Sequence, residues 1–172
     1  MTDNSSCDMR FFSTLLFAAL LTACNKPPKE VRSIQPVGRL TIPGHWNETN
    51  KLNDEADVQV CNELREQYLI VLTEPKKDFP TGFNLEAFAK LTSGAITQSA
   101  KGRAGASNKT TINGKDAVMT EISGTIDGVA VFYLHTAVEG SAHFHQIIAW
   151  TTAELESKNR PILEQAIRSF RE

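Results

Sequence analysis

The chain has 172 residues, and its 18 lysines and arginines against 20 aspartates and glutamates give a formal net charge of −2. This length suits a single domain, and a nearly neutral chain lacks the basic surplus that a nucleic-acid groove requires, so we expect no nucleic-acid partner. Only Cys61 lies in the body of the chain, where it has no cysteine partner for an intramolecular disulfide. No base lies beside it in the sequence, so we interpret Cys61 as a small buried hydrophobe.

The first predicted element is an apolar, uncharged run at residues 11–23, directly after Arg10. A transmembrane helix needs about 20 apolar residues, so this shorter run fits the apolar part of a secretory signal peptide better. The run ends in a branched residue, two small residues and a cysteine: Leu21, Thr22, Ala23 and Cys24. This order resembles the lipobox of bacterial lipoproteins. We therefore predict that residues 1–23 are a lipoprotein signal peptide.

The resemblance to a lipobox implies a lipid anchor on Cys24, with acyl chains such as palmitate, and a place in the bacterial cell envelope facing the periplasm. The membrane would then be a partner through this lipid. Asn25 is not the aspartate associated with inner-membrane retention, which favours the outer membrane in a Gram-negative cell. The acidic stretch at residues 1–8 suits a signal peptide badly, and we hypothesise that translation starts at Met9 rather than Met1.

A flexible tether is predicted at residues 24–36, because three prolines and mixed charges disfavour both helix and interior strand. The folded domain would then occupy residues 37–172. It opens with alternating apolar residues at Leu40 and Ile42 and a Pro-Gly turn. Two strands rich in β-branched and aromatic residues follow at 56–64 and 67–75.

A helix is predicted at residues 84–99, capped by Asn84 and with Leu85, Phe88 and Leu91 on its apolar side. The next segment, residues 101–109, has three cations, two glycines and no apolar anchors. We interpret it as a mobile, solvated loop. The alternative is a site that attracts anionic headgroups or polymers.

Four strands and a helix complete the chain. Turns at Asn113-Gly114, Asp127-Gly128 and Glu139-Gly140 separate strands at residues 109–112, 115–126, 129–138 and 142–151. The longest strands are apolar on both faces, so each face of the sheet needs a cover. A terminal helix with apolar residues at Leu163, Ala166, Ile167 and Phe170 provides one, and Pro161 either starts this helix or kinks a longer one. The predicted fold class is α+β, an antiparallel sheet with helices on both faces.

Several local patterns together resemble a known family. They are an early Pro-Gly-x-Trp (Pro43, Gly44, Trp46), the segment at residues 112–117, the Asp127-Gly128 turn and a closing helix that ends at residues 167–170. The chain resembles the PsbP/MOG α/β/α sandwich, most nearly the DcrB-like envelope lipoproteins. The resemblance implies a binding or accessory role and supplies no shared active site, and fold alone does not imply function.

Three histidines form the only candidate metal site that the sequence offers. His143 and His145 are two residues apart and share one face of a strand, and His135 lies on the neighbouring strand. With Val138 opposite His143, His135 falls on the other face, and a shift of one residue brings it opposite His145. We favour structural roles for all three and expect no metal and no cofactor.

The favoured function is a non-catalytic, membrane-anchored module that binds or assists another envelope component, with a protein partner. No catalytic motif occurs in the chain, so we predict that it is not an enzyme. Two alternatives remain open: a carrier of a small ligand or a metal through His135, His143 and His145, and an enzyme with an unrecognised site.

Overall fold

The structure of the chain is a computed structural model that describes residues 26–33 and 38–172. The predicted signal peptide at residues 1–23 and the lipobox residues Leu21, Thr22, Ala23 and Cys24 lie outside the described residues. The signal peptide, its cleavage and the lipid anchor therefore stay predictions. Within the described ranges, no helix has the length and apolar character needed to cross a membrane.

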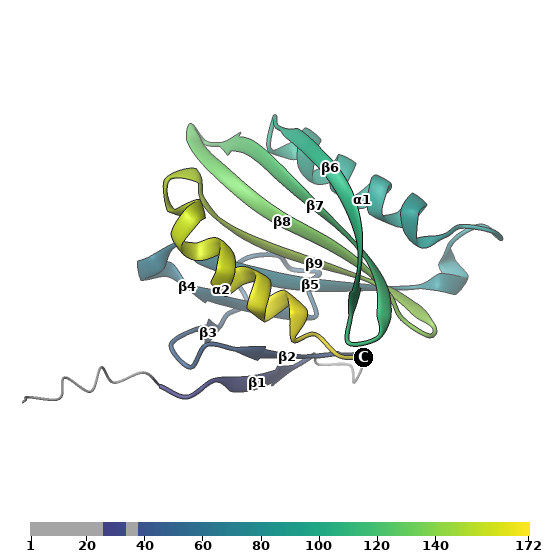
Figure 1. The fold of residues 1–172 in the computed structure, drawn as a ribbon, viewed down its shortest axis with the longest axis horizontal. Coiled ribbons are helices and arrows are strands. Elements are labelled where there is room, and N and C mark those ends of the chain that lie inside the picture. Colours follow the sequence, from purple (N-terminus) through teal and green to yellow (C-terminus); the bar gives the residue numbers. More distant parts are fainter. Residues whose placement is uncertain (1–25, 34–37) are drawn as a thin grey trace, which may run out of the picture.

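A seven-stranded antiparallel sheet forms the centre of the domain (Figure 1). Its strands run in the spatial order β3-β4-β5-β9-β8-β7-β6. Their bounds are Asn47–Glu48 for β3, Val58–Asn62 for β4, Gln67–Pro75 for β5, Arg103–Ile112 for β6, Lys115–Ile126 for β7, Val129–Glu139 for β8 and His143–Thr152 for β9. Left-handed backbone at Asn113 and Asp127, each followed by a glycine with positive φ, makes the tight turns that the sequence predicts.

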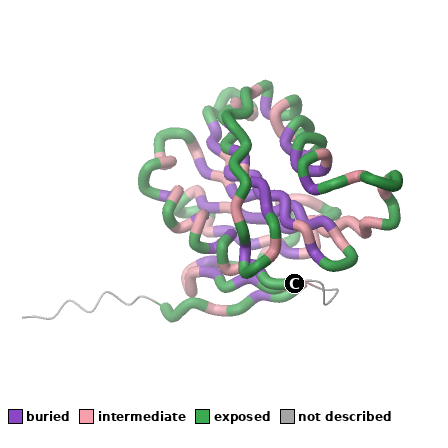
Figure 2. The backbone as a smooth tube through the Cα atoms, turned by 45° about the vertical axis from the view of Figure 1, so that its right-hand side comes forward, coloured by how far each residue is buried: buried purple, intermediate pink, exposed green. Residues whose placement is uncertain are grey.

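One helix covers each face of the sheet, which confirms the predicted α+β class (Figure 1). Helix α1 (Leu85–Ser99) lies over β7 and β8, and helix α2 (Glu156–Arg168) lies over β9 on the opposite face. The Asn84 side chain caps α1 by accepting a hydrogen bond of 2.9 Å from the backbone N–H of Ala87. Buried residues concentrate in the central strands and on the inner sides of the helices (Figure 2).

The two helices bury different kinds of surface. All four predicted apolar residues of the terminal segment are buried: Leu163, Ala166, Ile167 and Phe170. Pro161 lies inside α2, so that helix begins before it. In α1 the prediction for Leu91 is wrong, because Leu91 is 58% exposed while Thr92 and Ser93 are buried. The inner face of α1 therefore combines the apolar residues Leu85, Phe88 and Ala89 with the small polar residues Thr92 and Ser93.

The predicted flexible tether is wrong for part of its length. Strand β1 (Lys29–Arg32) pairs antiparallel with β2 (Arg39–Ile42) and buries Val31 against the main core. Pro27 lies so close to the domain that a Cβ on Gly44 would stand 2.0 Å from its carbonyl oxygen. A single apolar residue between charged neighbours gives no periodicity, so the sequence pattern does not predict β1.

The predicted mobile loop at residues 101–109 is also wrong, because most of it is strand β6. Residues Ser107–Ile112 pair with β7 in regular register, and a β-bulge separates Ala104 from Ser107. From Arg103 to Lys109 every residue is exposed. An edge strand that buries so little needs no apolar alternation, and lysine and a bulge are common on such strands.

The strand predicted at 56–64 is shorter in the structure, because β4 ends at Asn62 and a 3₁₀ turn, Glu63–Arg65, follows.

A buried chain of hydrogen bonds joins the Pro-Gly-x-Trp segment to both layers beneath it. Trp46 Nε1 donates to Gln67 Oε1 at 2.8 Å, and Gln67 Nε2 donates to Asn159 Oδ1 at 2.8 Å. Asn159 in α2 then donates to Thr151 Oγ1 at 2.8 Å and to the Arg65 carbonyl at 2.9 Å. Buried polar groups are tolerated only when they find partners, and here each partner belongs to a different element. The chain therefore fixes α2 relative to the sheet.

Candidate functional site

The sheet separates the three candidate metal ligands. His145 lies opposite Val138, and His135 lies opposite Ile148, so His135 and His145 project from opposite faces. His135 is packed under α1, and His145 contacts the ring of Phe170 on the α2 side. Neither register considered from the sequence occurs, although the first correctly places His135 on the other face. Residues 26–33 and 38–172 contain no cluster of three or more histidine, cysteine or acidic residues that could hold a metal ion.

His135 is a neutral core residue. Thr92 Oγ1 donates to the Phe88 carbonyl at 2.8 Å, so it accepts from His135 Nε2, which lies 2.8 Å away. The Nδ1 atom of His135 is buried and has no hydrogen-bond partner among the described residues. A proton on Nδ1 would have no acceptor there, and burial lowers the pKa of His135 to about 4. His135 therefore has a structural role and is not available as a metal ligand.

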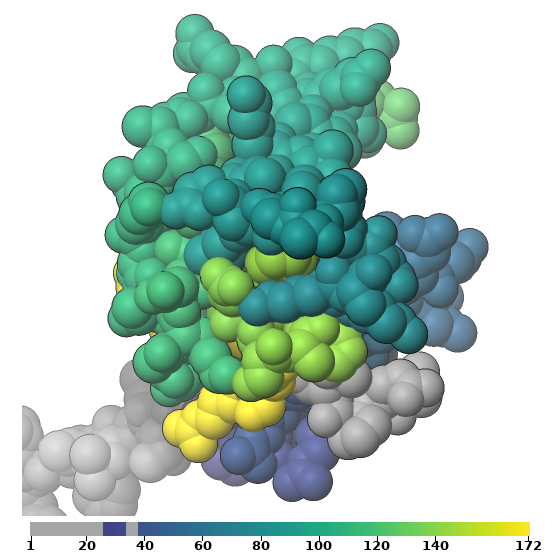
Figure 3. Space-filling view, turned by 90° about the vertical axis from the view of Figure 1, so that its right-hand side faces the viewer, coloured from purple at the N-terminus to yellow at the C-terminus, as the bar shows by residue number. Residues whose placement is uncertain are grey.

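His145 belongs to a cluster that ties the last described residues to two turns. Glu172 accepts hydrogen bonds from the Ser141 backbone N–H at 3.0 and 2.9 Å, and its carboxylate lies 3.0 Å from Lys115 Nζ. Figure 3 shows the yellow C-terminal segment against the yellow-green segment that contains the turn between β8 and β9. Burial raises the pKa of Glu172, but the hydrogen bonds from Ser141 and Lys115 outweigh it and lower the pKa to about 2. Burial lowers the pKa of His145, 3.6 Å from the carboxylate. The cluster acts as a structural clamp.

Cys61 does not carry the features of a nucleophile. It is buried in β4, and burial, followed by the charge of Glu63, raises the pKa of its thiol. A reactive cysteine needs the opposite shift. Cys61 and His45 both line a cavity of about 480 Å³, but the raised pKa keeps the thiol protonated rather than reactive. The predicted role of a small buried residue in a strand is therefore confirmed for Cys61.

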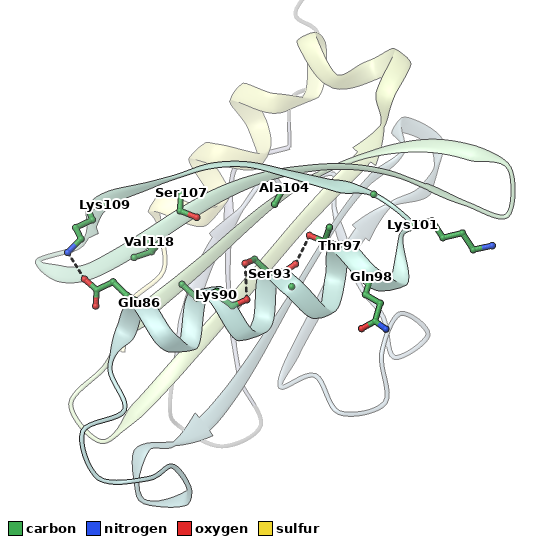
Figure 4. A pocket seen from close by; sticks show the side chains of 13 residues that line it. Glu86, Lys90, Ser93, Thr97, Gln98, Lys101, Ala104, Ser107, Lys109 and Val118 are labelled. Atoms are coloured by element: carbon green, nitrogen blue, oxygen red, sulfur yellow. Dashed lines mark hydrogen bonds and ion pairs between the residues drawn. The ribbon is translucent and has the colours of Figure 1, made fainter.

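A groove lies between α1 and β6. Its volume is about 810 Å³, within the range of roughly 300–1,000 Å³ typical of ligand sites. Figure 4 shows α1 along one side of this groove and β6 along the other. We call it the α1–β6 groove. Its lining consists of Glu86, Ala89, Lys90, Ser93, Gly94, Thr97, Gln98, Lys101, Gly102, Ala104, Ser107, Lys109 and Val118.

Small side chains keep this groove open. A Cβ added to Gly94, in the middle of α1, would meet no atom within 4 Å. Two hydroxyl groups in the walls of the groove already have hydrogen-bond partners in the protein. Thr97 Oγ1 donates to the Ser93 carbonyl at 2.7 Å, and Ser107 Oγ lies 2.8 Å from Thr120 Oγ1. The walls therefore have a fixed shape with little bulk, and they leave room for an occupant.

The groove is positively charged. Three lysines line it against one glutamate, Glu86, which forms an ion pair with Lys109 across one end (Figure 4). The hydrogen bond from Lys109 is the main cause that lowers the pKa of Glu86, and a backbone hydrogen bond and the charge of Lys109 add to it. Lys90 and Lys101 have no ion-pair partner among the described residues and are exposed. Two positive charges thus remain for an anionic occupant.

Sequence reasoning found only one wall of the groove. The alternative interpretation of residues 101–109, a site for anions, points to Lys101 and Lys109, which both line the groove. It missed the α1 wall, because Lys90, Ser93 and Gly94 look like an ordinary solvated helix face. The signal that was present is Gly94, a residue that weakens a helix interior and so suggests a need for space.

Gly94→Ala is expected to raise the free energy of unfolding by about 1 kcal/mol, because alanine favours a helix interior by that amount and the added methyl group meets no atom. Chemical denaturation monitored by circular dichroism measures it. The matched control is Gly124→Ala, where a Cβ would stand 2.6 Å from the Ala100 carbonyl oxygen and should destabilise the domain. A destabilised Gly94→Ala variant would show that this wall is closed.

No protein-family model matches the chain, and no curated protein matches it in sequence. Solved structures resemble it in fold. The cyanobacterial PsbP (CyanoP) from Synechocystis sp. PCC 6803 aligns with a TM-score of 0.63 at 11% identity, over 87% of this chain and 95% of that chain. LpqN, described as involved in cell envelope biogenesis of Mycobacterium tuberculosis, aligns with a TM-score of 0.62 at 10% identity, over 84% and 89%. These matches confirm a PsbP-like fold.

A third structure of this fold is PA94 from Pseudomonas aeruginosa, a protein of unknown function. It aligns with a TM-score of 0.52 at 13% identity, over 83% of this chain and 94% of that chain. At such identities the likeness extends to the fold and carries no site residues across.

Proposed function

We propose that this protein is a non-catalytic binding or accessory module of the bacterial cell envelope, anchored by a lipid on Cys24, facing the periplasm and related to the DcrB-like lipoproteins. The observation that carries the binding role is the α1–β6 groove. It has the size of a ligand site and an excess of positive charge, and small side chains hold it open.

The residues that line the groove suit binding and lack the groups that catalysis needs. Among the described residues that line it there is no histidine, cysteine or aspartate, and its one carboxylate, Glu86, is paired with Lys109. A general base or nucleophile needs a nearby partner that activates it. Elsewhere, burial lowers the pKa of His135 and raises that of Cys61, which suits structural roles. A binding function explains the groove without any additional group.

Two observations support the envelope as the location. The Leu21–Cys24 pattern resembles a lipobox, and one protein of the same fold, LpqN, is described as involved in cell envelope biogenesis. The docked strand β1 adds a geometric consequence. Only Asn25 separates Cys24 from the described residues, and two peptide units span at most about 7 Å. A lipid on Cys24 would therefore hold the domain directly at the membrane surface, and Asn25 favours the outer membrane.

The anchor is tested by Cys24→Ser. We expect this change to abolish labelling with a palmitate analogue and to move the protein from the membrane fraction to the periplasmic fraction after a high-salt wash. Lipid provides about 0.8 kcal/mol of membrane affinity per buried methylene, and the near-neutral chain offers little electrostatic substitute. Cys7→Ser is the matched control and should keep label and location. A Cys24→Ser protein that is still labelled and membrane-bound would refute the anchor.

A further inference from the structure

We infer that the α1–β6 groove binds one long acyl chain with an anionic headgroup, the ligand class of a free fatty acid. This inference rests on the proposed binding function and specifies its ligand. Three features of the groove carry it: walls whose exposed atoms are mainly apolar, a length that matches one acyl chain, and lysines whose charge is not compensated.

The walls of the groove are mainly apolar. Ala89, Ala104 and Val118 supply apolar side chains. The lysines add their methylene stems, because such side chains lay the stem along apolar surface and keep the ammonium group in water. The hydroxyls of Thr97 and Ser107 already have hydrogen-bond partners within the protein, so they need none from a ligand. Methylene groups that leave water for such a surface favour binding.

The groove has the dimensions of a single acyl chain. Along α1 its lining runs from Glu86 to Gln98, which at 1.5 Å per residue is about 18 Å. An acyl chain spans half of the hydrocarbon core of a bilayer, about 15 Å. One side of α1 faces one strand, β6 (Figure 4), and Gly94 leaves the middle open, since a Cβ there would meet no atom within 4 Å. One extended chain fits this shape better than the two chains of a phospholipid.

The two ends of the groove differ in charge, and this difference orients the ligand. At one end Glu86 is paired with Lys109, which leaves that end nearly neutral (Figure 4). Lys101 lies at the other end and Lys90 lies between them, and both are exposed and have no ion-pair partner among the described residues. A carboxylate near Lys101 would compensate this charge. The tail then points toward Val118, which lies opposite Lys109 on β7.

Other occupants fit the groove less well. The lipid predicted on Cys24 enters the domain through β1, which packs into the core beneath α2, whereas α1 packs into a separate core on the other face (Figure 1). The groove ligand is therefore a separate molecule. A small anion would leave the apolar walls in water, and a neutral chain would leave the lysines uncompensated. A fatty acid satisfies both the walls and the charge.

The test is photoaffinity labelling of the full-length protein in phosphatidylcholine nanodiscs. The probe is palmitate with a diazirine at the end of its chain, and mass spectrometry identifies the labelled peptides. We expect label on peptides that contain Ala89 and Val118. Palmitate should displace this label at least tenfold more effectively than hexadecanol, which has the same chain without the charge, and acetate should not displace it. A lipid on Cys24 lies on a different peptide and does not interfere.

Gly94→Phe fills the middle of the groove and should lower the labelling of these peptides at least fivefold. Ala95→Phe is the matched control, because it adds the same ring at an exposed position of α1 that does not line the groove, and it should keep the label.

Lys101→Gln keeps the test valid if Gly94→Phe disturbs the fold, because Lys101 is exposed. We expect it to weaken displacement by palmitate at least fivefold and to leave displacement by hexadecanol unchanged. Lys77→Gln, at an exposed position outside the groove, should change neither. Absence of label from the groove, or label unchanged by both groove variants, would overturn the inference. Equal displacement by palmitate and hexadecanol would also overturn it, but would leave an apolar binding groove and the binding role intact. The Cys24→Ser result concerns the anchor alone.

Discussion

Asn159→Leu is expected to lower the free energy of unfolding by about 3 kcal/mol. Leucine keeps the branched arrangement of side-chain heavy atoms but removes the hydrogen bonds that Asn159 makes with Gln67, Thr151 and the Arg65 carbonyl. Gln67 and Thr151 are 1% and 0% exposed, so water cannot replace the lost partner. Each buried polar group left without a partner costs about 1–3 kcal/mol. Urea denaturation at pH 7, followed by tryptophan fluorescence, measures the loss.

The matched control is Gln165→Leu, the same kind of change at an exposed position of α2. An exposed substitution of this type usually changes stability by less than about 0.5 kcal/mol. Trp46 offers an internal reporter, since its indole N–H is bonded to Gln67. If Asn159→Leu were as stable as Gln165→Leu, the chain of hydrogen bonds would not hold α2 in place.

The second large effect concerns pH. We expect the protein to lose about 2 kcal/mol of stability between pH 8 and pH 5 through His135 alone. The pKa of His135 is about 4 in the folded state, against about 6.5 in an unfolded chain. Below pH 6.5 His135 takes up a proton in the unfolded state but stays neutral in the folded state. The free energy of unfolding therefore falls as the pH is lowered to about 4 and then levels off. Above pH 6.5 both states hold neutral histidine, and this contribution is constant.

His135→Gln removes the titrating group and retains a side chain that can hydrogen bond to Thr92, which lies 2.8 Å from the histidine nitrogen. We expect its stability at pH 5 and pH 8 to differ by about 2 kcal/mol less than in the wild-type protein. His143→Gln, the same change at a half-exposed position, should retain the wild-type difference. Urea denaturation at the two pH values provides the comparison. Identical pH dependence of the wild-type and His135→Gln proteins would contradict a buried, neutral His135.

Where local chemistry decides a conformation, sequence reasoning succeeded. The Asn113 and Asp127 turns need left-handed backbone, which these residues tolerate before glycine, and both occur at φ 48°. The amide of Asn84 caps a helix wherever that helix begins. Apolar residues at helical spacing in α2 have only one way to bury their common face.

Where a segment depends on distant partners, sequence reasoning failed. Strand β1 forms because β2 and the core accept Val31. Strand β6 forms because β7 offers a free edge, and its exposed residues show no apolar alternation. The two faces of the histidine strands depend on register, and the turn in which the Gly140 N–H donates to the His143 carbonyl at 2.9 Å sets that register.

The sequence by itself determined the α+β class, the order of the main strands and helices, and the lack of a recognisable catalytic motif, because these depend on periodicity, turn chemistry and the residue types present. Its prediction of a lipid on Cys24 concerns residues that the structure does not describe. The tertiary structure decided that His135 and His145 lie on opposite faces and that α1 meets β6 in an open, positively charged groove. Such a groove joins residues from separate elements, and only packing of the whole chain determines which side chains come together and where space remains.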